Sequence, residues 1–284
     1  MVNEFLHSGS GLRAVESLVR EVADEEIMSR FRTLSGDEVA QKSGPLDLVT
    51  TADQRAEESL TASLTALLPG SAVVGEEAVD ADRSVLTSLE GTDPVWVVDP
   101  LDGTRAFVHG QPGFCMLVAL VQRGDVLASW TYLPAQDRMA VAHRGHGALL
   151  DGRPLRAGAP VPGGALAVAT SFYNFSDEAQ EEALQRLRTP GCEPRPITSA
   201  GCAYLDVASG AVDALAFAWE SPWDHAAGLL LVEEAGGACA TLAESPFRLT
   251  GDNPLPLAAA RDEATLQRVL RVLRGDGAPS EAPA

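Results

Sequence analysis

The segment WVVDPLDGT, which runs from Trp96 to Thr104, constrains the fold of this chain more than any other feature. Its apolar, β-branched start predicts a buried strand, and Pro100 predicts that the strand stops there. Gly103 has the backbone freedom for a tight turn into a following helix. The segment therefore predicts two carboxylates, Asp99 and Asp102, at the end of a buried strand.

Two carboxylates in one turn suggest a metal site. Hard divalent cations such as Mg²⁺ prefer oxygen ligands, and the turn offers Asp99, Asp102 and the carbonyl of Leu101. The amides of Gly103 and Thr104, if they begin a helix, can hold an anion. Cation and phosphate can thus meet at one turn. A loop in which Asp and Gly only shape the chain is an equally good interpretation of this motif alone.

Three further segments also carry acids at the ends of apolar runs. They are Val73–Glu77, which contains Glu76, the stretch Asp47–Asp53, and Pro222–Gly228, which contains Asp224. Glu76 and Asp224 are expected to converge with the two acids of the first segment. Four acids in one cleft repel one another, so two or more Mg²⁺ ions are the simplest explanation for the cluster.

In this order and at these separations, the four segments resemble the inositol monophosphatase family of Mg²⁺-dependent, lithium-sensitive phosphatases, over residues 10 to 270. The resemblance implies an α+β fold with a layered αβαβα sandwich, and a homodimer. It implies a phosphomonoesterase that hydrolyses a small phosphorylated metabolite by direct attack of water, with two or three Mg²⁺ ions and no phosphoenzyme.

The resemblance also implies roles for individual residues. The matching residues hold a first metal through Glu76, Asp99, the Leu101 carbonyl and Asp102, and a second through Asp99, Asp102 and Asp224. Glu76 and Thr104 position the attacking water, and Asp47 corresponds to an acid that assists at a further metal and the water. Substrate contacts are expected from Asp102, Gly103, Thr104, Gly201, Cys202, Ala203, Phe217 and Glu220.

The identity of the substrate remains open in the sequence. Phe217 occupies the position where typical members carry a Glu that binds substrate hydroxyls, and Glu220 is a nearby substitute. After the DGT motif the chain has Arg105, where the family usually has Asn before Phe. Inositol phosphate, histidinol phosphate, a sugar phosphate and 3′-phosphoadenosine 5′-phosphate are therefore alternatives. A noncatalytic binding or regulatory descendant would be expected to lack a metal acid, and none is missing.

Composition narrows the class of protein. The chain has 284 residues, 45% of them hydrophobic, with a formal net charge of −19. Such a charge repels nucleic acid and anionic membranes, so neither is expected as a partner. We expect a cytoplasmic enzyme, because no apolar run reaches the ~18 residues of a spanning helix and the N-terminus lacks a signal peptide. His225 is expected to pack rather than to react.

Hydrophobic periodicity predicts the following elements. Helices are expected at 12–31, 52–68, 177–188, 203–208, 224–235 and 263–273. Strands are expected at 72–74, 95–98, 114–121, 126–133, 138–142, 165–170 and 214–218. Residues 80–93 are expected to form an exposed connection. A Pro/Gly-rich connector at 157–164 separates a half spanning 1–156, which carries most metal ligands, from a half spanning 157–274, and 275–284 is expected to be a disordered tail.

Overall fold

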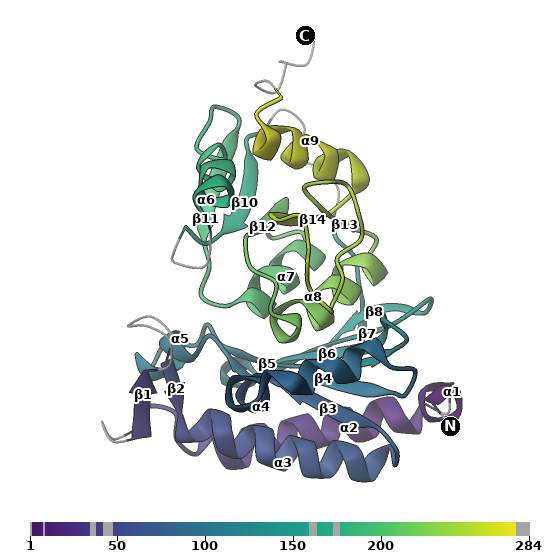
Figure 1. Cartoon of the computed structure of the whole chain (residues 1–284). Helices are drawn as coiled ribbons and strands as arrows, with labels where there is room; N and C mark the ends of the chain where they lie inside the picture. The colour runs from purple at the N-terminus through teal and green to yellow at the C-terminus, as the bar shows by residue number, and fades with distance from the viewer. Residues whose placement is uncertain are drawn as a thin grey trace.

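The computed structural model describes residues 2–7, 9–34, 38–41, 48–158, 164–172 and 177–276. Within these ranges the elements stack as alternating layers of helices and sheets (Figure 1). Helices α1, α2 and α3 cover one face of a seven-stranded sheet, and α7 and α8 cover the other face. A five-stranded sheet follows, with α6 and α9 on its outer side. This arrangement confirms the expected α+β layered αβαβα sandwich.

The helices have these bounds: α1 Val2–His7, α2 Ser10–Val22 (continued by a π-helical turn, Ala23–Met28), α3 Thr51–Leu67, α4 Glu76–Ala81, α5 Thr104–Val108, α6 Glu178–Gln185, α7 Ala200–Ala208, α8 Pro222–Glu234 and α9 Glu263–Arg274. Two 3₁₀ helices span Arg83–Glu90 and Pro134–Gln136. The connection expected at 80–93 therefore contains helical turns, whose short length hides them from periodicity.

The seven-stranded sheet has the order β3-β4-β5-β6-β7-β8-β9, and the five-stranded sheet has the order β11-β10-β12-β14-β13. A small sheet pairs β1 with β2. The strands are β1 Val39–Gln41, β2 Leu48–Thr50, β3 Ala72–Gly75, β4 Val95–Asp102, β5 Cys115–Gln122, β6 Asp125–Leu133, β7 Arg138–His143, β8 Gly147–Leu150, β9 Arg153–Leu155, β10 Leu166–Thr170, β11 Cys192–Pro196, β12 Ala214–Phe217, β13 Ala238–Thr241 and β14 Leu257–Ala260.

Strand β4 is apolar without alternation because both faces of its sheet are covered. Trp96 and Val98 belong to the core beneath α1–α3, whereas Val95 and Val97 belong to the core beneath α7 and α8. A strand buried on both sides must be apolar at every position until it leaves the sheet. The first charged side chain of β4, Asp99, therefore marks the place where the buried part of the strand ends and a site can form.

Pro100 does not end β4, so the expected stop at this residue was wrong. The strand continues to Asp102 through a bulge: Asp99 pairs with Leu117 and Asp102 with Cys115, so three steps on β4 oppose two on β5. A bulge leaves one residue unpaired, so a proline without an amide hydrogen is tolerated there.

Helix α7 begins at Ala200, not at the expected residue 203. Ser199 caps it, because its side chain accepts a hydrogen bond from the amide of Cys202. The strands and α-helices that were not predicted have six residues or fewer, too few to show a clear period; they are strands β1, β8, β9, β11, β13 and β14 and helices α1 and α4. One core cluster contains residues from both sides of the 157–164 connector, such as Val97 and Leu230, so the division into halves stays a prediction.

Candidate active site

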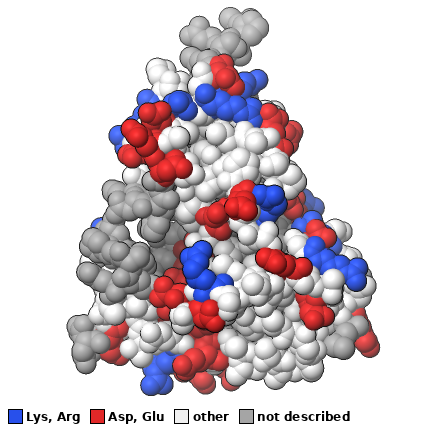
Figure 2. Space-filling view, viewed as in Figure 1, with Lys and Arg blue, Asp and Glu red and all other residues white. Residues whose placement is uncertain are grey.

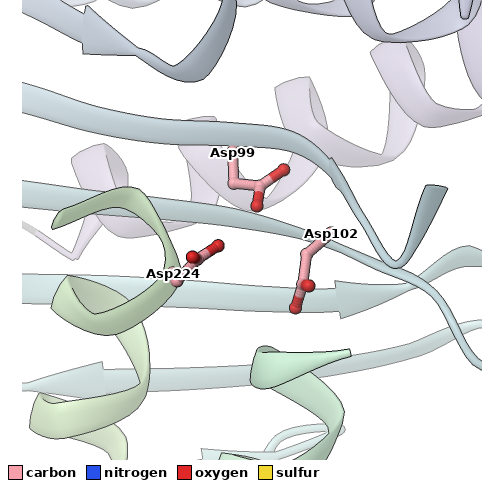
Figure 3. A group of neighbouring side chains, drawn as sticks. All are labelled: Asp99, Asp102 and Asp224. Atoms are coloured by element: carbon pink, nitrogen blue, oxygen red, sulfur yellow. The ribbon is translucent and has the colours of Figure 1, made fainter. Parts of the chain in front are cut away.

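The β4 bulge directs two acids to the same side of the sheet. Residues three apart in a regular strand face opposite sides, because side chains alternate. The extra residue between Asp99 and Asp102 restores a common side. There they meet Asp224, and one oxygen of each carboxylate lies within 4.8 Å of the others (Figure 3). The cluster therefore follows from a local irregularity of the backbone.

Asp224 lies in the first turn of α8, in the C-terminal part of the chain. Pro222 opens this helix, a position where its missing amide hydrogen costs nothing. The indole nitrogen of Trp219 donates a hydrogen bond of 2.8 Å to Oδ2 of Asp224. This contact holds the Asp224 side chain, whose carboxylate points toward Asp99 and Asp102 in Figure 3.

Asp102 is held by the start of α7. Its Oδ1 accepts from the amide of Ala200 at 3.1 Å, and its Oδ2 accepts from the amide of Gly201 at 2.6 Å. A Cβ on Gly201 would lie 2.6 Å from Sγ of Cys115 and 3.1 Å from Oδ2 of Asp102. Only glycine permits this approach, so Gly201 positions a carboxylate through its backbone.

The electrostatics of the cluster call for a cation. Burial raises the pKa of Asp99 well above its usual range, and the charges of Glu76, Asp102 and Asp224 raise it further. Burial, followed by Asp102 and Glu76, likewise raises the pKa of Asp224 well above its usual range. Burial also raises the pKa of Asp102, although the two amides oppose it. An oxygen-only donor set with this repulsion suits a hard divalent ion.

Glu76 lines the same cavity and begins α4 directly after β3. A second acid, Glu57 on α3, fixes that helix start: its carboxylate accepts from the amides of Glu77 at 2.8 Å and Ala78 at 2.7 Å. A Cβ on Gly75 would lie 2.3 Å from the carboxyl carbon of Glu57. Gly75 therefore makes room for the buried acid that positions the backbone next to Glu76.

Thr104 follows the Leu101 turn and lines the cavity. Its hydroxyl lies 3.0 Å from the Leu101 carbonyl and 3.1 Å from Oδ1 of Asp53. One hydroxyl proton serves one acceptor at a time, so Asp53 is the remaining acceptor when the carbonyl binds an ion. Burial raises the pKa of Asp53 to about 6. Asp47, expected near the water, lies outside the described residues.

A cavity of about 670 Å³ surrounds the cluster. It is lined by Glu76, Asp99, Leu101, Asp102, Gly103, Thr104 and Asp224, all of which were expected at the site. Two arginines, Arg83 and Arg105, also line it. The wall on the side of the five-stranded sheet includes Ser171, Ile197 and Trp219.

Five of the expected substrate contacts do not line this cavity. Phe217 is fully buried and stacks on Trp219 with ring centroids 4.3 Å apart. Glu220 accepts hydrogen bonds of 3.0 Å from both the amide and the side chain of Asn253, at the base of another loop. Neither lines the cavity, and the same holds for Gly201, Cys202 and Ala203 on α7.

His225 packs, as expected. It is fully buried, and its Nε2 donates to the carbonyl of Trp219 at 2.9 Å, because a carbonyl can only accept. Its Nδ1 then accepts from the hydroxyl of Tyr204, also at 2.9 Å. Burial lowers the pKa of His225 to about 4, so the ring is neutral and holds the Trp219 backbone.

The sequence reasoning missed Asp53 and Glu57. Both are acids on the inner face of α3, where the helical pattern calls for apolar residues: Asp53 is 1% exposed and Glu57 is 5% exposed. A charged residue in the apolar stripe of a helix is the signal that was available, since buried acids require partners. Asp53 also completes a capping box with Thr50 at the start of α3.

A sandwich of this kind, with acids that converge at the end of a central strand, has a donor set suited to divalent cations. Comparison with known sequences identifies the family. The Inositol monophosphatase family profile matches residues 10–274. The inositol-1-monophosphatase of Rhizobium meliloti is 37% identical over 199 residues, covering 68% of this chain and 72% of the relative. The Nus factor SuhB of Pseudomonas aeruginosa is also 37% identical over 199 residues, covering 67% and 71%.

A solved structure of an IMPase from Thermotoga maritima aligns with a TM-score of 0.76 at 26% identity, covering 93% of this chain and 96% of that chain. The chain therefore belongs to the inositol monophosphatase family. Membership supports a phosphatase of this superfamily and suggests that it uses a divalent metal ion. No described helix is long and apolar enough to cross a membrane.

Proposed function

We propose that this protein is a Mg²⁺-dependent phosphomonoesterase that hydrolyses a small phosphorylated metabolite. The observation that carries the proposal is the convergence of Asp99, Asp102 and Asp224 within 4.8 Å at a cavity that Glu76 also lines. Bound cations would reverse the local charge in a chain of net charge −19 and so allow an anionic substrate to enter.

The residues present fit two or three Mg²⁺ ions. Asp99, Asp102 and Asp224 would hold them, with Glu76 and the Leu101 carbonyl as further ligands. The ions would polarise the phosphoryl oxygens, lower the pKa of the attacking water and stabilise the leaving alkoxide. All donors are oxygens, and in Asp102 both oxygens are already oriented by amides. Asp47 remains a proposed ligand of a further ion.

Asp53 and Thr104 would form a hydrogen-bond chain to the attacking water. Thr104 donates to Asp53 and so presents its hydroxyl oxygen as an acceptor toward the cavity. A water that donates to this oxygen and to Glu76 would be oriented for in-line attack on phosphorus. This assigns to Asp53 the supporting role that the sequence reasoning gave to Asp47.

Arg83 and Arg105 supply positive charge at the same cavity. They would attract an anionic substrate toward the acid cluster, because focused charge raises local ligand concentration. On the face seen in Figure 2, Lys and Arg are interspersed with Asp and Glu among the described residues. This mixed surface favours a small phosphorylated substrate over a nucleic acid. The homodimer and the cytoplasmic location remain proposals that follow from the family resemblance.

Release of inorganic phosphate from a panel of phosphomonoesters tests the proposal. The panel comprises inositol 1-phosphate, histidinol phosphate, fructose 1,6-bisphosphate and 3′-phosphoadenosine 5′-phosphate, each assayed with Mg²⁺ and with a chelator. At least one compound should be hydrolysed only with Mg²⁺, and the ranking of kcat/KM identifies the substrate class. If none is hydrolysed, a noncatalytic binding or regulatory role replaces the proposal.

A further inference from the structure

A second cavity, of about 440 Å³, adjoins the active-site cavity. The two share Ser171 and Ile197 in their walls, so the two spaces lie side by side. The second cavity is large enough for a ring or a phosphate group, since small-molecule sites begin at about 300 Å³.

The position of the second cavity in the fold is typical of a binding site. Strands β10 and β11 run parallel, as do β10 and β12. The cavity is lined by Thr170, at the carboxyl end of β10, and by Pro194 and Pro196, in the middle and at the carboxyl end of β11. Ligands in open α/β sheets bind outside the carboxyl ends of parallel strands, where loops diverge and backbone groups are free.

The lining combines apolar rings with one cation. Phe172, Pro194 and Pro196 provide flat apolar surfaces, and Arg188 provides the charge. The guanidinium carbon of Arg188 lies 4.3 Å from the centre of the Phe172 ring, which holds the side chain at the wall.

Arg188 differs from the neighbouring arginines in its partners. Arg186 pairs with Glu182 and Arg195 pairs with Glu193, whereas Arg188 pairs with no carboxylate in the part of the chain that the structure describes. In a protein with 40 acids and 21 basic residues, a cation without an acidic partner on a cavity wall is suited to an anionic ligand.

We propose that the second cavity binds a second anionic group on the leaving portion of the substrate, joined to the scissile phosphate through a flat apolar ring. This proposal rests on the proposed phosphatase function, because it assumes that the scissile phosphate occupies the acid cluster. Arg188 contacts the second anion, and the Phe172 and proline surfaces contact the ring. The substrate class is then an aromatic or heterocyclic phosphomonoester with two anionic groups.

A pair of compounds that differ by one phosphate tests the subsite. Adenosine 3′-phosphate and 3′-phosphoadenosine 5′-phosphate share the ring and the scissile 3′-phosphate, and only the second compound carries the distal anion. With Mg²⁺, wild-type protein should show a kcat/KM for 3′-phosphate release about 10-fold higher for the bisphosphate, the size expected of one charge-assisted contact. Arg188→Ala should abolish this preference through a higher KM for the bisphosphate.

Arg195→Ala is the matched control. It removes an exposed arginine from the same strand that contributes two prolines to the cavity, but Arg195 does not line the cavity. The preference for the bisphosphate should survive in this variant. If wild type shows no preference, or if Arg188→Ala retains it, the subsite assignment is wrong.

Calorimetric titration with adenosine 5′-phosphate provides a readout that needs no turnover. In the presence of Mg²⁺, Arg188→Ala should weaken binding about 10-fold relative to wild type and to Arg195→Ala. If no phosphomonoester is hydrolysed, the proposed function fails and this titration alone decides the subsite. Equal affinities in all three proteins would then overturn it.

Discussion

The hydroxyl of Thr104 lies 3.1 Å from the carboxylate of Asp53, although 51 residues separate them in the chain. Asp53 is held in place by Thr50, whose amide and hydroxyl both donate to Oδ2 at 2.8 Å and 2.5 Å. Oδ1 alone is therefore left for Thr104. Asp53 therefore has two roles: it completes the N-terminal capping box of α3, and it accepts a hydrogen bond from Thr104 at the active site.

Asp53→Asn tests this relationship. An amide cannot take a proton from Thr104, so kcat should fall by about 100-fold or more, in the range of a lost general-base contribution. KM should change little, because Asp53 is not a metal ligand in our proposal. A kcat of Asp53→Asn close to that of wild type would contradict the assignment.

The pKa of Asp53 predicts a pH dependence of activity. Burial raises this pKa to about 6, so the carboxyl becomes protonated below that pH and can no longer take a proton from Thr104. The profile of kcat/KM should therefore fall on the acid side near pH 6. An acid limb that is identical in wild type and in Asp53→Asn would show that another group controls it.

The same shift predicts how stability depends on pH. The folded-state pKa of about 6 exceeds the reference value of 3.8, so the native state binds the proton more tightly than the unfolded state. This contribution to stability is fully present below pH 3.8 and is lost as the pH rises through about 6. In metal-free protein, the Tm of wild type relative to Asp53→Asn should decline across this window. An increase in the Tm of wild type relative to Asp53→Asn across this window would contradict the prediction.

Gly75→Ala tests how Glu57 positions the start of α4. The new Cβ would lie 2.3 Å from the carboxyl carbon of Glu57, so that side chain must leave the amides of Glu77 and Ala78. We expect a loss of about 1–3 kcal/mol in the free energy of unfolding, and a lower kcat because Glu76 shifts. Gly91→Ala is the control, since its nearest contact would be an ordinary 3.4 Å. Equal stabilities of the two variants would contradict this account.

Phe217→Glu tests where Phe217 lies. The residue was expected to contact substrate, and an introduced Glu would then improve turnover of inositol 1-phosphate. Because Phe217 is fully buried against Trp219, we expect instead a destabilisation of more than about 3 kcal/mol from the buried charge and lost packing. Phe217→Leu should cost less than about 1.5 kcal/mol. A stable Phe217→Glu protein with improved turnover of inositol 1-phosphate would restore the original expectation.

The acid cluster could be predicted from the sequence because it depends on a strong local signal, whereas the layered fold was predicted from the resemblance to the family. An apolar run followed by an acid, as at Val98 and Asp99, marks the edge of a doubly covered sheet in the chain itself. The bulge at Pro100 was not predictable, because it depends on pairing with β5. The role of Asp53 required knowing which side of α3 faces Thr104. The burial of Phe217 depends on the distant Tyr204 and Trp219.

Turnover and metal binding in Asp99→Asn test the central claim most directly. Phosphate release from the best substrate should require Mg²⁺ in wild type. In the variant it should fall by more than about 100-fold, because even the loss of a residue that hydrogen-bonds to a metal ligand costs about 10–100-fold. Asp80→Asn, which alters an exposed acid of the same cavity outside the cluster, should keep its activity.

Thermal unfolding, measured with and without Mg²⁺ on the same three proteins, gives the decisive measurement. Mg²⁺ should raise the Tm of wild type and of Asp80→Asn. At 100 times the Kd, the ion should add about 2.7 kcal/mol to their free energy of unfolding. Asp99→Asn should fold, with a metal-free Tm at or above that of wild type because the repulsion is relieved, and should gain little from Mg²⁺. Wild-type levels of both turnover and Mg²⁺ stabilisation in Asp99→Asn would contradict the account.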